Sequence, residues 1–370
     1  MSHPVIQFEH RPGILDLGWG HPHPSLLPVQ AWARASAGSL RRFGWQSLTY
    51  GYATGPAPLL DWLTDHLNRL EDGGTTVEQL FVTGGASHGL ALVTALLTHP
   101  GDVVLVDSPT YHLALEILRD CGVSLSPAPR EPSELTTLIR MLRAGGRTVP
   151  MLYLVPTFGN PTGTSLSDDR RRALIELARA ENLTIVEDDT YRELVYDPPA
   201  PVSLWRLAGG SPVVRLGSFA KTVAPGLRLG WINAAPPLIG RLARLGYVDS
   251  GGGVNHSVAM AMAAFGSSGD YEQHVAAVRD HYRTQRDALA GALGVTAPAG
   301  GWFLWLPLPD GVTAGDLLPV AEAKGVSFVP GPRFFVDGGG ADRVRLSFSH
   351  LAPGDLRRAA GILRDAITAC

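Results

Sequence analysis

The chain has 370 residues, of which 45% are hydrophobic, so we expect one large domain and a smaller one around well-filled cores. A formal net charge of -3 without basic runs argues against nucleic acid or membrane as a partner. The two cysteines, Cys121 and Cys370, cannot form a disulfide framework or a metal cluster, and the segment Met1–Pro4 does not begin a secretion signal. We therefore expect a cytoplasmic protein without a metal site.

The first 35 residues are rich in Pro, Gly and His and contain no convincing helix or strand, so we expect an arm that runs over the surface or onto a neighbouring subunit. From about residue 80, short apolar runs alternate with helical periodicity, which is typical of a mostly parallel sheet covered by helices. The strands are predicted at Leu80–Val82, Val103–Asp107, Met151–Val155, Thr184–Glu187 and Val213–Leu216. The helices are predicted at Ser87–Leu97, Thr110–Cys121, Pro132–Arg143 and Ser167–Ala180.

The pattern changes near residue 256. A long amphipathic helix is predicted over Tyr271–Leu293. Strands follow at Trp302–Leu306, Val326–Val329 and Val344–Phe348, among two more helices. We therefore divide the chain into an arm (1–35), a large α/β domain (36–255) and a small α+β domain (256–370).

Polar residues follow the predicted strands at the point where open α/β sheets bind their ligands. These segments are Thr83-Gly84-Gly85-Ala86-Ser87, Asp107-Ser108-Pro109-Thr110-Tyr111, Asn160-Pro161-Thr162-Gly163, Glu187-Asp188-Asp189-Thr190-Tyr191 and Gly217-Ser218-Phe219-Ala220-Lys221. Taken singly, most of them have an ordinary structural explanation, as tight turns, β-turns or helix caps. A glycine pair before a helix can also cradle a phosphate with exposed N–H groups.

Lys221 is harder to explain as a surface residue. Of the 31 basic residues, only Lys221 and Lys324 are lysines, and Lys324 is expected at a helix end before Gly325. Arginine would serve equally well on a surface, but its guanidinium stays protonated and cannot form a Schiff base. A lysine can do so once burial or a cationic neighbour, here Arg228, lowers its pKa. We therefore expect Lys221 to bind a carbonyl compound.

These segments together resemble the fold type I pyridoxal-phosphate aminotransferases of class I and II, in particular the branch of the 2-aminoadipate and kynurenine aminotransferases. Ser218–Trp231 resembles the family signature S-F-S-K-x-x-x-P-G-L-R-x-G, while Asn160–Gly163 and Glu187–Tyr191 resemble its N-P-T-G and E-D-D-x-Y motifs. The resemblance spans nearly the whole chain. It implies a large domain with a mostly parallel, seven-stranded sheet, a smaller α+β domain, pyridoxal 5'-phosphate as cofactor and a homodimer that shares its active sites.

The resemblance also implies a role for individual residues. Lys221 binds the cofactor as an aldimine and then acts as the base, and Asp188 keeps the pyridine nitrogen protonated. Tyr191 and Asn160 contact the ring hydroxyl, and Tyr111 stacks on the ring. The implied phosphate contacts are Ala86, Ser87, Ser218 and Arg228, with Tyr50 reaching the phosphate of the partner subunit. Arg345 binds the substrate α-carboxylate, close to Asn160, Trp19 and Gly20.

Departures from the family pattern concern the substrate pocket. Trp19 stands where the family usually has one of two adjacent glycines, so its indole should reshape the pocket and, with Tyr111, favour an apolar or bulky side chain. Ala86-Ser87-His88 replaces the common S-Q-Q, and Gly159 stands where Gln often precedes the Asn. These changes make an ordinary aminoadipate or kynurenine enzyme a weaker prediction.

We predict an aminotransferase that moves an amino group between an L-amino acid and a 2-oxo acid. The alternative on the same fold diverts the carbanion into β-elimination from a cysteine conjugate or into decarboxylating or oxidative deamination, as in specialised metabolism. A more remote alternative is a ligand-sensing regulator that has this fold but lacks its DNA-binding head, since about 35 residues without a basic helix precede the fold.

Overall fold

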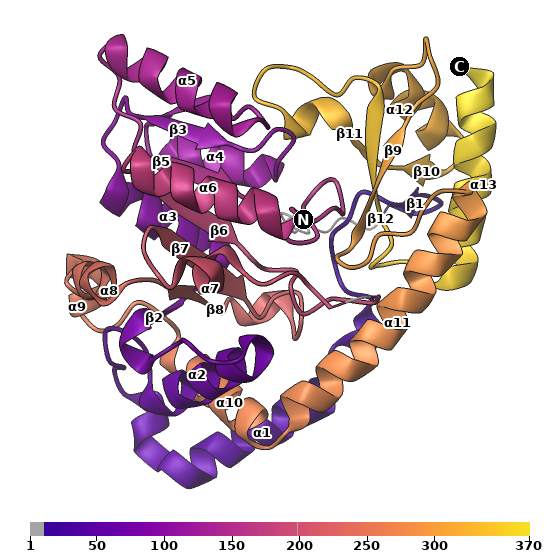
Figure 1. Ribbon diagram of the computed structural model, residues 1–370. Helices are drawn as coiled ribbons and strands as arrows, with labels where there is room; N and C mark the ends of the chain where they lie inside the picture. The colour runs from indigo at the N-terminus through magenta and orange to yellow at the C-terminus, as the bar shows by residue number, and fades with distance from the viewer. Residues whose placement is uncertain (1–10, 198) are drawn as a thin grey trace, which may run out of the picture.

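A computed structural model describes residues 11–197 and 199–370, so the first ten residues of the predicted arm lie outside the described residues. A seven-stranded sheet and a three-stranded sheet form the centres of two units, which the long helix α11 (Asp270–Leu293) connects (Figure 1). No helix in the described ranges is long and apolar enough to cross a membrane.

The large sheet has the strand order β2-β8-β7-β6-β5-β3-β4. Its strands are β2 (Leu80–Thr83), β3 (Val103–Val106), β4 (Ser124–Pro127), β5 (Met151–Leu154), β6 (Thr184–Asp188), β7 (Val213–Ser218) and β8 (Gly230–Asn233). Only β8 runs antiparallel to its neighbours. The mostly parallel sheet and its five predicted strands are therefore confirmed, whereas β4 and β8 were not predicted.

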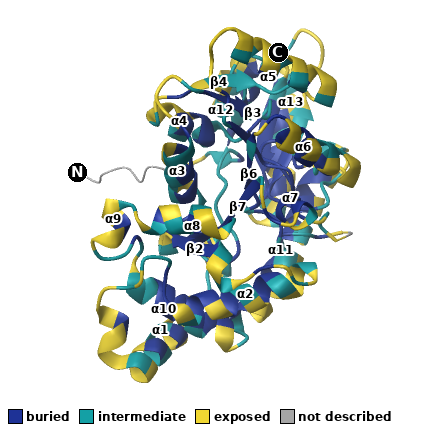
Figure 2. Cartoon of the chain, turned by 60° about the vertical axis from the view of Figure 1, so that its left-hand side comes forward, coloured by how far each residue is buried: buried dark blue, intermediate teal, exposed yellow. Residues whose placement is uncertain are grey.

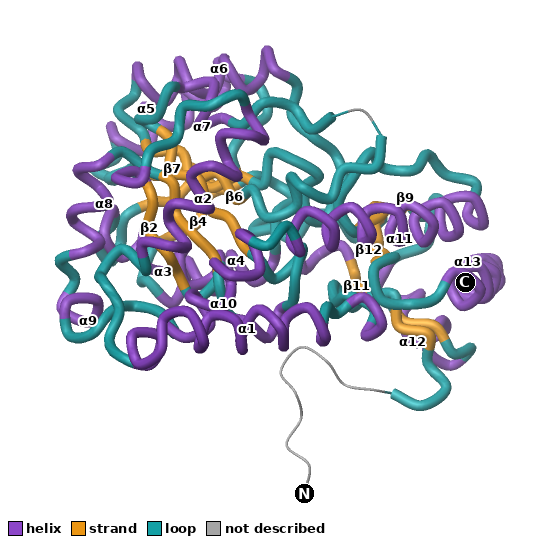
Figure 3. The backbone as a smooth tube through the Cα atoms, turned by 90° about the horizontal axis from the view of Figure 1, so that it is seen from below, coloured by secondary structure: helices purple, strands orange, loops and turns teal. Residues whose placement is uncertain are grey.

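Helices cover both faces of this sheet (Figure 3). One face packs against α3 (Ala86–Leu97), α4 (His112–Asp120) and α8 (Pro236–Ala243). The other face packs against α5 (Pro132–Ala144), α6 (Asp168–Ala180) and α7 (Leu204–Ala208). Because β2, β3 and β5 are buried on both faces, their sequences are continuous apolar runs rather than alternating ones.

A third layer packs below the β2 edge. It consists of α1 (Val29–Phe43), α2 (Ala57–Glu71) and α10 (His256–Ser267), which share one apolar cluster with β2. The expectation that the first 35 residues hold no helix is wrong, because α1 begins at Val29. Its inner face includes small residues such as Ala31 and Ala35. Since α10 packs on α1 and α2, we propose a domain boundary within α11 rather than at residue 256.

The small unit is an antiparallel sheet of β11 (Val329–Pro330), β12 (Arg343–Ser347) and β9 (Phe303–Pro307), packed against α11 and α13 (Pro353–Ala369). The predicted strand Val326–Val329 is divided: β10 (Val326–Ser327) pairs instead with β1 (Leu15–Asp16) of the arm. The arm therefore joins the small unit as a strand. The remaining α-helices of the described residues are α9 (Gly246–Asp249) and α12 (Ala314–Ala323).

Candidate active site

Most of the predicted site residues meet between the carboxyl edge of the large sheet and the small unit. Figure 2 shows that the strands leading to this edge, including β6 and β7, are buried. The arm passes over the same place, since the carbonyl groups of Gly18 and Gly20 accept hydrogen bonds from Arg345 and Lys221 respectively. Three distant parts of the chain therefore build one site.

Lys221 lies just after β7, and its side chain points toward the small unit. Its Nζ is 3.5 Å from the Gly20 carbonyl oxygen and 4.8 Å from the centre of the Trp302 ring. Burial, followed by the charge of Arg345, lowers the pKa of Lys221 from 10.5 to about 8, although Asp188 partly opposes this shift. The amine can therefore be neutral, and hence nucleophilic, near neutral pH.

Asp188 is the last residue of β6 and is buried. Its Oδ2 accepts a 2.8 Å hydrogen bond from the Tyr153 hydroxyl, and its Oδ1 accepts a 3.0 Å hydrogen bond from the Thr190 hydroxyl. Burial raises the pKa of Asp188, while these two donors lower it. No arginine, lysine or histidine of the described residues forms an ion pair with Asp188, so a protonated ring nitrogen suits this carboxylate as its counter-charge.

Arg345 projects from β12 into the site and is 4% exposed. Its Nη1 donates to Asn160 Oδ1 at 2.9 Å, and its Nη2 donates to the Gly18 carbonyl at 2.7 Å. The guanidinium carbon lies 4.2 Å from the centre of the Phe303 ring, and Nε has no hydrogen-bond partner among residues 11–197 and 199–370. Burial lowers the pKa of Arg345 to about 10. A bound carboxylate would supply the missing acceptor and the counter-charge.

Two tyrosines lie between these charged groups. Tyr191 is buried beside Asn160 and packs edge-on against the rings of Trp302 and Phe303. Tyr111 stands at the N-terminal end of α4, where burial and the charge of Asp188 raise its pKa to about 12. Both hydroxyls therefore remain protonated hydrogen-bond donors over the physiological pH range.

The predicted phosphate residues meet at the start of α3. Gly85 precedes Ala86 with φ +100°, and a side chain there would come within 3.0 Å of the Arg228 guanidinium. Arg228 also donates to the Gly84 carbonyl at 3.1 Å. Ser87 and Arg228 are exposed, and Ser218 ends the neighbouring β7. This glycine-lined helix start, with a guanidinium beside it, fits a phosphate group.

Of the remaining predicted site residues, Trp19 and Gly20 lie in the arm near the site, whereas Tyr50 lies at the surface. Trp19 is half-buried, with its ring edge-on to His21 at 6.0 Å. Gly20 lies so close to β9 that a side chain there would come within 3.1 Å of Phe303. Tyr50, in contrast, is 82% exposed and lies beside Gly251 at the surface. The structure therefore does not bring Tyr50 into the site of its own chain.

Sequence reasoning missed Tyr153, Thr190 and Trp302. Tyr153 lies within an apolar strand, where an aromatic residue indicates only core packing. Trp302 is fully buried, yet its ring also lies beside the Lys221 amine. For Tyr153, the alternation of side chains along a strand could have indicated the contact. Tyr153 pairs with Val186, and Asp188, two residues further along β6, points to the same face of the sheet as Val186.

Residues 13–363 match the family model described as aminotransferase class I and II. The chain is 31% identical to aromatic-amino-acid aminotransferase 1 of Thermococcus litoralis, over 96% of this chain and 88% of that one. It is 34% identical to 2-aminoadipate transaminase of Thermus thermophilus, over 94% of this chain and 88% of that one. It is also 32% identical to an uncharacterized HTH-type transcriptional regulator of Bacillus subtilis, YisV, over 95% of this chain but 73% of that one.

Solved structures agree with these similarities. The kynurenine aminotransferase of Pyrococcus horikoshii superposes with a TM-score of 0.89 at 28% identity, covering 96% of this chain and 91% of that one. The α-aminoadipate aminotransferase LysN of Thermus thermophilus, solved in complex with N-(5'-phosphopyridoxyl)-L-leucine, superposes with a TM-score of 0.85 at 31% identity, covering 97% and 93%.

Proposed function

Because the chain belongs to the class I and II aminotransferase family, we propose that Lys221, Asp188 and Arg345 perform its reaction. The protein is a pyridoxal-phosphate-dependent enzyme that transfers an amino group between an amino acid and a 2-oxo acid. Pyridoxal phosphate supplies an aldehyde carbon that takes up the amino group and a ring that withdraws electrons from the reacting carbon. The observation that supports the assignment best is the buried Asp188, which forms no ion pair within residues 11–197 and 199–370 and faces the same site as the low-pKa Lys221.

Lys221 would hold the cofactor through its Nζ. Its amine, whose pKa is about 8, would serve as the base that takes the Cα proton of the substrate. Asp188 would favour a protonated ring nitrogen. Asn160 and Tyr191 would orient the ring through hydrogen bonds, and Tyr111 would pack against it.

Arg345, whose Nε has no hydrogen-bond partner among the described residues, binds the substrate α-carboxylate. The start of α3, Ser218 and Arg228 bind the phosphate. We further propose a donor with an apolar or bulky side chain. The rings of Phe303 and Phe334 pack against the Arg345 guanidinium. The half-buried Trp19 stands between Gly18 and Gly20 of the arm, whose carbonyl groups contact Arg345 and Lys221. The relative named as an aromatic-amino-acid aminotransferase supports this choice.

We also propose that two copies of this chain form a homodimer in which Tyr50 reaches the phosphate of the partner subunit. Several large hydrophobic side chains gather on the segment that follows α1 and are mostly exposed: Trp45 (74%), Leu48 (72%), Tyr50 (82%) and Tyr52 (76%). Such a contiguous exposed group is typical of a protein interface. A cytoplasmic location is proposed as well, since Cys121 and Cys370 are both free thiols.

The decisive experiment follows the visible spectrum of the bound cofactor after single amino acids are added without any 2-oxo acid. A transaminase stops after one turnover in the pyridoxamine form. Continuing release of ammonia would instead establish elimination or oxidative deamination. Cofactor binding without turnover on any amino acid would favour the regulator, a class that the similarity to YisV keeps in view.

The lysine assignment has its own test. Lys221→Ala should abolish the cofactor bond that borohydride reduces, while Lys324→Ala, at the C-terminal end of α12, should leave it intact. The opposite result would refute the proposed role of Lys221.

A further inference from the structure

Three consecutive acidic residues end β6 and begin the following turn, and all of them are buried: Glu187, Asp188 and Asp189. Successive side chains of a strand point to opposite faces, so Asp188 faces the site while its two neighbours point away from it. Glu187 accepts hydrogen bonds from the backbone N–H groups of Leu204 and Trp205 at the start of α7. Two further buried carboxylates therefore lie directly behind Asp188.

Buried arginines neutralise these carboxylates. Arg215 of β7 contacts Asp189 at 2.7 Å and Glu71, at the end of α2, at 2.6 Å. Arg192 contacts the same two acids. The six members of this ion cluster, none with a side chain more than 7% exposed, are Glu71, Glu187, Asp189, Arg171, Arg192 and Arg215.

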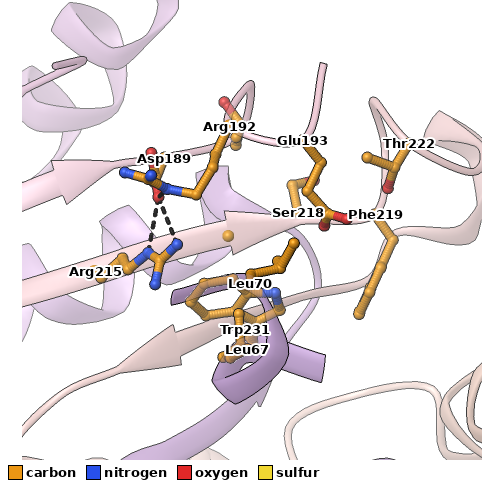
Figure 4. A pocket seen from close by; sticks show the side chains of 12 residues that line it. Leu67, Leu70, Asp189, Arg192, Glu193, Arg215, Ser218, Phe219, Thr222 and Trp231 are labelled. Carbon is orange, nitrogen blue, oxygen red and sulfur yellow. Dashed lines mark hydrogen bonds and ion pairs between the residues drawn. The ribbon is translucent and has the colours of Figure 1, made fainter. Parts of the chain in front are cut away.

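Arg215 has little freedom to move. Its guanidinium carbon lies 5.3 Å from the centre of the Trp231 ring, and Gly217 leaves space for that ring, since a side chain there would come within 2.0 Å of it. Figure 4 shows Arg215 reaching Asp189 above Trp231. A cavity of about 20 Å³ adjoins the pair and is lined by Asp189, Arg215 and Ser218 among others, which is room for a single water molecule.

The charges of the cluster cancel, since three carboxylates face three guanidinium groups. Asp188 is then a buried carboxylate without an ion-pair partner in the described part of the chain, and its charge is available to a protonated ring. The balance is sensitive, because the negative charge of Asp189 raises the pKa of Asp188, whereas Arg192 and Arg215 keep the pKa of Asp189 low. Loss of one guanidinium would place an additional buried anion behind Asp188.

We propose that Arg215 is a positioning residue, itself held by Glu71, that fixes Asp189 and balances its charge, so that Asp188 stays ionised beside the cofactor ring. The inference rests on the proposed function of Asp188 and Lys221. It concerns residues that touch neither substrate nor cofactor. The titratable groups facing Asp188 itself are Tyr111 before α4, Tyr153 of β5, Tyr191 in its own turn and Lys221 after β7.

The test titrates the visible absorbance of the lysine-bound cofactor in the holoenzyme against pH. In Arg215→Met a buried positive charge is lost, so the cationic cofactor linkage should titrate about one pH unit higher. In Glu71→Gln, a nearly isosteric change, a negative charge is lost and the midpoint should fall by a similar amount. The double variant keeps the cluster neutral, and its midpoint should return to that of the wild type.

Arg241→Met, which removes an exposed arginine on α8, is the matched control and should leave the midpoint unchanged. If Arg215 and Glu71 had a purely structural role, both variants would lose thermal stability, but their titration midpoints would not move in opposite directions. Equal midpoints in all variants, or shifts of the same sign in Arg215→Met and Glu71→Gln, would overturn the proposal. If Arg215→Met does not fold, the sign of the Glu71→Gln shift decides. A wild type that forms no lysine-bound cofactor would refute the proposed function instead.

Discussion

The low pKa of Lys221 predicts an unusually reactive amine in the cofactor-free enzyme. With a pKa of about 8 in place of 10.5, roughly one tenth of Lys221 is neutral at pH 7, compared with about 0.03% for an ordinary lysine. The rate of reaction with an amine-selective reagent should therefore be about 300-fold higher at this pH than that of an unperturbed lysine. Peptide mapping by mass spectrometry assigns the modification to the tryptic fragment that contains Lys221.

The cause of the shift can be tested in the same assay. The pH dependence of the modification rate should have its midpoint near 8, and Arg345→Gln should move that midpoint upward, because the Arg345 charge disfavours a second cation. Arg343→Gln, at the half-buried first position of the same strand, is the control and should have little effect. A wild-type midpoint near 10.5, or a downward shift in Arg345→Gln, would refute the electrostatic reasoning.

Three further predictions concern neighbouring side chains. Tyr153→Phe removes a hydrogen bond that lowers the pKa of Asp188. The activation free energy should rise by about 1 kcal/mol, which slows the half-reaction roughly fivefold in stopped-flow measurements. An unchanged rate would show that this donor is dispensable. Trp302→Ala should lower the free energy of unfolding in urea by about 3–5 kcal/mol, against less than about 0.5 kcal/mol for Met141→Ala, whose side chain is 61% exposed. Trp19→Gly should raise KM for bulky apolar donors relative to KM for alanine, because the indole that favours such side chains is lost; identical donor preferences in both enzymes would remove Trp19 from the substrate pocket.

Parts of the fold were predictable because burial on both faces leaves a simple trace in the sequence. The strands β3 and β5 are uninterrupted apolar runs, and Pro132 and Ser167 mark the starts of α5 and α6. In contrast, β4 is a short edge strand with alternating serines, and its sequence resembles a loop. The strand β8 contains only Gly230–Asn233, and we read it as the end of the lysine motif.

The site was predictable wherever residues are contiguous in a motif, as around Lys221 and Asp188. It was not predictable where contacts depend on tertiary packing. Arg215 lies in an otherwise apolar strand, and nothing local indicates that Glu71, 144 residues earlier, will meet it. The division of Val326–Val329 between two sheets likewise depends on pairing with the arm, which no local pattern encodes.

The arm has a consequence for the order in which the protein is made. Leu15 pairs with Val326, and the Gly18 carbonyl binds Arg345, 327 residues later. At about 5–20 residues per second, the ribosome releases these partners roughly 20–60 s after the arm. During that interval Lys221 and Asp188 have been synthesised, but β12 and the proposed carboxylate-binding Arg345 have not. A chain interrupted before β12 therefore contains Lys221 but lacks Arg345, whose charge helps to lower the pKa of that lysine.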